Sequence, residues 1–182
     1  MQMGYCSLAL ERMNYVQTVF KLLNENVNNS SNFKNHINLL SVDLFQVFEI
    51  YYKAVLVKIN NLDYNATEKD INENNIKDVY KRIALKYLIK SHNLIDLENA
   101  VPAQYRLFNK NLDLLRDIRS VYFVNRYQAN AKIKNLNFKS YFRILLNVKR
   151  NIVSLYDSKN NFRNDISNIN NSMKSIKSVN FN

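Results

Sequence analysis

Histidine and cysteine are scarce in this chain, and this limits the chemistry it could carry out. Among 182 residues there are two histidines, His36 and His92, and one cysteine, Cys6. A zinc site needs three or four converging histidine, cysteine or carboxylate ligands, so we expect neither a metal nor a cofactor. A single cysteine permits no intramolecular disulfide. This fits the cytoplasm or another reducing compartment, including that of an organelle or a virion.

His92 lies in the stretch SHNLIDLENA, between a helical run and Pro102, the only proline. A catalytic histidine would need a nucleophile on a strand-turn-helix elbow, and the sequence shows none. We therefore expect His92 to end one helix, where its ring or charge satisfies the last carbonyl groups.

The carboxylates give no catalytic pattern either. Asp96 and Glu98 are two residues apart and would not face each other on a helix. Glu68, Asp70 and Glu73 fall in an expected first turn, where acids favour the helix dipole. No catalytic residue is predicted.

Charge is the strongest functional signal. The net charge is +11. Residues 119–182 hold twelve basic and two acidic residues, whereas residues 1–118 hold fourteen and thirteen. This asymmetry predicts an anionic partner, with RNA favoured over DNA and an acidic protein surface as the alternative.

Two sets of basic residues recur at helical spacing beside aromatic residues. A solvated helix face is the competing interpretation of the first set. The candidates for phosphate contact are Lys77, Lys81, Arg82, Lys86 and Lys90 in one segment, and Lys139, Arg143, Lys149 and Arg150 in another.

Glycine and proline decide the fold class. The chain has one of each, too few for the turns of a sheet protein. With the periodicity of the apolar residues, this predicts an all-α bundle of about five helices over residues 1–157. The expected helices span about 4–27, 35–59, 73–90, 103–125 and 136–156, with a short one near 93–99 that Val101-Pro102 closes. No run of apolar residues is long enough to span a membrane.

The apolar residues also predict which helix faces are buried. In the first helix the apolar residues at helical spacing are Tyr5, Leu8, Val16, Phe20, Leu23 and Val27. The helix over 73–90 should bury Ile76, Val79, Tyr80, Ile83, Tyr87 and Leu88, opposite its lysines.

Residues 158–182 form a predicted basic arm. Its apolar residues follow a heptad spacing of 4, 3, 4 and 3. We expect this arm to become helical only against the bundle or a partner, as in a homo-oligomer or a larger assembly. The seam consists of Phe162, Ile166, Ile169, Met173 and Ile176.

Three segments in order resemble the HEPN superfamily of helical domains found in toxin–antitoxin, defence and RNA-processing systems. They are LFQVFEIYYKAVLVKI with Lys53-Ala54, SHNLIDLENAV with His92, and LLRDIRSVYFVNRYQ with Tyr122 and Arg126-Tyr127. The resemblance implies that His92 is a structural histidine and adds Arg126 to the candidate binding residues. Active members carry an arginine with a histidine four to six residues later, and no such pair is present here.

We therefore predict a non-catalytic, nucleic-acid-associated helical protein of HEPN-like type. One alternative is a structural or assembly subunit of a viral or organellar nucleoprotein particle. The other is a HEPN-type ribonuclease with a divergent active site.

Overall fold

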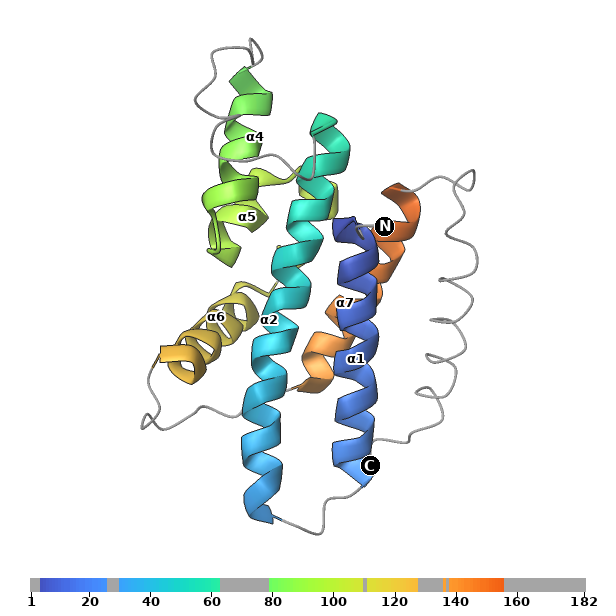
Figure 1. Ribbon diagram of the computed structural model, residues 1–182, viewed down its shortest axis with the longest axis vertical. Coiled ribbons are helices and arrows are strands. Elements are labelled where there is room, and N and C mark those ends of the chain that lie inside the picture. The colour runs from blue at the N-terminus through green and yellow to red at the C-terminus, as the bar shows by residue number, and fades with distance from the viewer. Residues whose placement is uncertain are drawn as a thin grey trace.

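The computed structural model describes residues 4–25, 30–62, 79–109, 111–127, 136 and 138–155. Within these ranges the protein is all-α, as predicted, and contains no strand (Figure 1). The elements are α1 (Tyr5–Glu25), α2 (Ser30–Asn60), α4 (Val79–Lys90), α5 (Leu94–Ala100), the 3-10 turn η1 (Ala103–Tyr105), α6 (Leu112–Tyr127) and α7 (Phe138–Leu155). The predicted arm over 158–182 lies outside the described residues.

Helix α2 is the centre of the bundle. It contacts α1, α4, α5, α6 and α7. In Figure 1, α4, α5 and α6 lie along one side of α2, and α1 and α7 lie on the other. A helix covered on several sides must be apolar around most of its circumference. The fully buried residues of α2 include Leu44, Phe45, Val47, Phe48, Tyr51, Tyr52 and Val55.

Helix α1 packs along α2 through a face that matches the predicted one only in part. Val16 is buried as predicted, and Tyr5 and Phe20 are half-buried against the core. The buried residues Cys6, Ala9, Met13 and Val16 alternate in steps of three and four, which is the seam of two nearly parallel packed helices. Leu8, expected in the core, is half-buried instead. The prediction weighted large apolar side chains and overlooked the small residues Cys6 and Ala9, which are also buried.

Local contacts fix the two ends of α5. The closure at Val101-Pro102 was predicted, and of Asn93 and Ser91, the two N-caps that the sequence allows, the structure uses Asn93. Asn93 is the N-cap, and its side-chain oxygen accepts a hydrogen bond of 3.2 Å from the Ile95 amide. Val101 adopts an extended conformation before Pro102 and ends the helix.

The stretch after α5 corrects the predicted start of the next helix. Residues 103–105 form η1, residues 106–109 are irregular, and α6 begins at Leu112 instead of residue 103. The Glu98 carboxylate accepts hydrogen bonds from the amides of Leu107, at 3.1 Å, and Phe108, at 2.8 Å. Both side chains are buried. This contact holds the segment against the core and prevents it from joining α6.

The structure also corrects the predicted loop before α2 and the predicted buried face of α4. Residues from Ser30 onward already belong to α2. On α4 the buried residues are Ala84, Leu85 and Leu88. Val79, Tyr80 and Ile83, expected in the core, are 62%, 80% and 48% exposed. The lysines of α4 therefore share an outward face with apolar side chains.

Aromatic side chains join α2 to the segments on both sides of it. The Phe48 ring meets Phe108 edge-on at a centroid distance of 5.1 Å and lies 6.2 Å from the Tyr141 ring. The Tyr51 hydroxyl donates to the Tyr105 carbonyl at 2.8 Å and accepts from Asn151 at 2.7 Å. None of the described helices has the length and apolar character that crossing a membrane requires.

Candidate nucleic-acid interface

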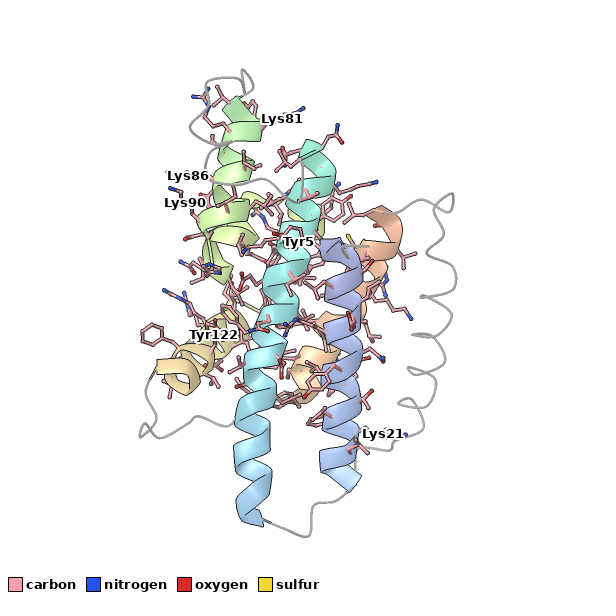
Figure 2. The ribbon with its side chains drawn as sticks, viewed as in Figure 1. Tyr5, Lys21, Lys81, Lys86, Lys90 and Tyr122 are labelled. Carbon is pink, nitrogen blue, oxygen red and sulfur yellow. The ribbon has the colours of Figure 1, made fainter. Side chains whose placement is uncertain are left out.

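The outward face of α4 combines cations with an exposed ring. We use "the α4 face" for Val79, Tyr80, Arg82, Ile83, Lys86 and Lys90, all of which are exposed. Helix α4 has four basic residues and no acidic one. Lys86 and Lys90 point away from α2 (Figure 2). The half-buried Lys81 side chain lies on the side of α4 that faces α2. The fifth candidate of this set, Lys77, lies outside the described residues.

The second predicted set lies on α7. Arg143 and Arg150 are exposed on one stripe together with Leu146 and Val153. Lys149 is half-buried, and this burial lowers the pKa of its ammonium group. The side chains of Lys139 and Arg126, two further candidates, lie outside the described part of the structure.

The two basic surfaces are separate. Helices α4 and α7 lie on different sides of α2 (Figure 1). The fold therefore does not bring the candidates of α4 and α7 into a single patch. A strand that neutralises the α4 face would have to pass around the bundle to reach Arg143 and Arg150.

Helix α6 carries two arginines that were not among the predicted candidates for phosphate contact. Arg116 and Arg119 are exposed. They lie on one stripe of α6 with two exposed apolar residues, in the order Leu112, Arg116, Arg119 and Phe123, at intervals of four, three and four residues. This spacing was visible in the sequence. It went unnoticed because the whole segment from 103 was taken as a helix whose apolar residues face the core.

His92 bonds to a carboxylate and not to the carbonyl groups at the end of α4. Its Nδ1 lies 2.8 Å from Glu49 Oε1, and the same oxygen accepts from Lys53 Nζ at 2.8 Å. Lys53 is buried, while the His92 side chain is 70% exposed. His92 follows the end of α4, as predicted, but its ring bonds to Glu49 instead of the last carbonyl groups.

Through its contact with His92, the Glu49 carboxylate of α2 connects the segment between α4 and α5 to the central helix. Its negative charge adds to burial in raising the pKa of the half-buried Tyr5 hydroxyl. Among the described residues, no three histidine, cysteine or carboxylate side chains gather as ligands of a metal ion. The arrangement can orient the His92 imidazole, but among the described residues its hydrogen-bond partner is the Glu49 carboxylate and not a nucleophile.

Comparisons with known proteins give one match of low identity. No family model and no solved structure matches the chain. The chain is similar to a protein described as "HEAT repeat-containing protein 1 homolog" from Dictyostelium discoideum, with 24% identity over 153 residues. The match covers 76% of this chain and 7% of that protein.

The described architecture differs from a stack of helical repeats. In such a stack each helix pair contacts only its neighbours. Here α2 contacts the other five α-helices, and the helix lengths range from 7 to 31 residues. The similarity to the Dictyostelium protein therefore adds no repeat architecture to the described part of this chain.

Proposed function

We propose that this protein associates without catalysis with single-stranded nucleic acid, RNA more than DNA, through the α4 face. The observation that carries the proposal is the Tyr80 side chain, 80% exposed on a helix with four basic residues and no acidic one. Nonspecific single-strand binding combines cations that follow the backbone with aromatic rings on which bases stack.

The geometry of α4 suits both requirements. Lys86 and Lys90 are four residues apart and project from the same side of the helix. Arg82 adds a guanidinium group, whose fork of donors matches phosphate oxygens. Tyr80 is a ring on the flank of the same face. Phosphate contacts position a strand without reading its sequence, so we expect little sequence preference.

The HEPN resemblance remains part of this proposal. Two of the three segments that carry it meet at Glu49, which bonds both Lys53 and His92. Since the sequence lacks the arginine–histidine pair of active members, the proposal is a binding member and not a ribonuclease.

An assembly subunit is the second candidate. It is supported by the exposed apolar side chains of Val79, Ile83, Leu146 and Val153, which lie among the cations of α4 and α7. Apolar side chains that gather on a surface mark contacts with other macromolecules. The net charge of +11 fits packaging of an anionic polymer in such an assembly.

The test compares two charge reversals of equal size. Lys86→Glu with Lys90→Glu changes the α4 face, and Arg143→Glu with Arg150→Glu changes α7. Each pair lowers the net charge by four, from +11 to +7. Binding of a dye-labelled, unstructured RNA would be measured by anisotropy from about 50 mM salt upward. We expect the α4 pair to lose affinity and its log–log salt slope to shallow by about 1.4, since each single-strand phosphate contact contributes about 0.7.

The variant with Arg143→Glu and Arg150→Glu should bind RNA more weakly only because its net positive charge is lower. Its salt slope should equal that of the unchanged protein. Because the reversed side chains are exposed, neither pair should alter the unfolding midpoint much. Equal losses and equal slopes for both pairs would argue against the α4 face as the contact surface. If the unchanged protein binds neither RNA nor DNA and sediments as an oligomer, the assembly function takes the lead.

A further inference from the structure

A surface pocket lies on the outward face of α6. It measures about 400 Å³ and is lined by Arg116, Arg119, Ser120, Phe123 and Val124. This volume falls within the range of about 300–1,000 Å³ typical of small-ligand sites. The lining combines two guanidinium groups, a hydroxyl group, an aromatic ring and an aliphatic side chain.

The arrangement places the ring next to a cation. Arg119 and Phe123 are four residues apart on α6 and are therefore neighbours on the helix surface. The Phe123 side chain is 54% exposed. Arg116 donates to Asp113 at 3.2 Å, and both side chains of this pair are exposed. Arg119 has no acidic partner among the described residues, so its charge is the one available to a ligand.

We infer that the α6 pocket binds one nucleotide unit of a single-stranded RNA, with its base stacked on Phe123 and its phosphate held by Arg119. The inference rests on the proposed function and names a second contact of the same strand. Base–aromatic stacking tolerates any base, and a guanidinium fork takes two phosphate oxygens at once. Val124 gives the base an apolar edge, and Ser120 can bond to the ribose or phosphate.

The position of α6 fits a strand that also touches the α4 face. Helices α4, α5 and α6 lie along the same side of α2 (Figure 1). A strand on this side could contact α4 and α6 without crossing the bundle. The carboxylates of an acidic peptide could pair with the two arginines, but they would not stack on the exposed Phe123 ring beside them.

The experiment uses the full chain and an unstructured RNA of about twelve nucleotides, within the span of known single-strand sites. The RNA carries an end dye for anisotropy and one central 2-aminopurine. The fluorescence of 2-aminopurine is quenched when this base stacks on an aromatic ring. Phe123→Leu and Arg119→Gln test the pocket, and Phe123→Tyr should preserve stacking. Tyr15→Leu on α1, where the ring is 55% exposed, and Lys58→Gln on α2 are matched controls.

We expect Phe123→Leu to weaken binding about ten-fold and to abolish the quenching. Arg119→Gln should weaken binding about ten-fold and reduce the salt slope by about one contact. Phe123→Tyr, Tyr15→Leu and Lys58→Gln should behave as the unchanged protein.

Two outcomes separate this inference from the proposed function. If Phe123→Leu and Arg119→Gln bind as the unchanged protein while Lys86→Glu with Lys90→Glu binds weakly, the α6 pocket is not a nucleotide site, but the α4 face still binds RNA. If the unchanged protein does not bind the RNA at all, the proposed function fails and the inference with it. Poly-glutamate should displace the RNA from Phe123→Leu at a lower concentration than from the unchanged protein. Displacement of the RNA at the same poly-glutamate concentration from both proteins would also overturn the role of the ring.

Discussion

At the scale of single residues, Glu98 connects α5 to α2 and to the segment before α6. It is 3% exposed, and its carboxylate accepts from the Tyr52 hydroxyl and from two backbone amides. A buried carboxylate is costly unless its oxygens are fully bonded. The same hydrogen bonds satisfy amides in a segment that belongs to no helix. Burial and the nearby Glu98 charge raise the pKa of Tyr52 well above its ordinary value, so this hydroxyl remains a donor.

This arrangement predicts that Glu98→Gln destabilises the protein. The glutamine amide can accept from one of the two backbone amides, but its NH₂ group then opposes a donor. A buried group left without its partner costs about 1–3 kcal/mol. Urea unfolding followed by circular dichroism would measure the loss as a lower midpoint. Tyr52→Phe should cost less, about 1 kcal/mol, because both amides keep their acceptor. A Glu98→Gln midpoint equal to that of the unchanged protein would contradict this role.

At the scale of elements, the sequence predicts what local contacts decide. The ends of α5 follow from Asn93 and Pro102, which act within a few residues. The closure at Pro102 was predicted correctly, and Asn93 is one of the two N-caps that the sequence allows. The buried face of α4 was not predicted correctly, because apolar residues occupy two faces of this helix. One face contains Val79, Tyr80 and Ile83, and the other contains Ala84, Leu85 and Leu88. The contacts with α2 and α5 select the second, and nothing inside α4 reveals this.

The candidate site shows the same limit. Lys86, Lys90, Arg143 and Arg150 are exposed, as their spacing predicts. Their separation onto two sides of α2 depends on how the helices pack. The exposure of Leu112 and Phe123 beside the arginines of α6 could not be predicted, because packing against α2 decides which face of α6 is buried.

The interface of α1 with α2 predicts a measurable pH dependence. Arg12 lies 3.5 Å from Asp43 and also bonds to Gln46. Burial raises the pKa of the Asp43 carboxyl, and the Arg12 charge only partly opposes this. A carboxyl whose pKa is higher in the folded state contributes stability when protonated, and this stability is lost as the pH rises through the folded pKa.

Asp43→Asn should therefore gain stability relative to the unchanged protein as the pH rises from about 3.8, the ordinary value, through the raised pKa. Above that pKa the difference should be constant. Urea unfolding at a series of pH values would measure it. Arg12→Gln removes the opposing cation and should extend the effect to higher pH. A difference that falls with pH would mean that the Arg12 pairing outweighs burial.

At the scale of the whole molecule, the contacts of α2 predict that the described bundle unfolds as a single cooperative unit. Helix α2 separates the side with α4, α5 and α6 from the side with α1 and α7, and it contacts both (Figure 1). The proposed binding surfaces of α4 and α6 therefore rest on the same helix that supports α7. A surface carried on such a shared core should survive substitution of exposed residues and fail when the core fails.

Phe48→Ala tests this cooperativity. The Phe48 ring is fully buried and contacts Phe108 on one side of α2 and Tyr141 of α7 on the other. Removing a buried ring costs about 3–5 kcal/mol, a large part of the 5–15 kcal/mol typical of a domain. We expect the urea midpoint to fall, while helix content in the far ultraviolet and tyrosine signal in the near ultraviolet are lost together in one transition. RNA binding should disappear along the same transition. If helix content were lost in two steps, with only one side of α2 melting early, the two sides would be independent units joined by α2, and binding at α4 would not report on the stability of α7.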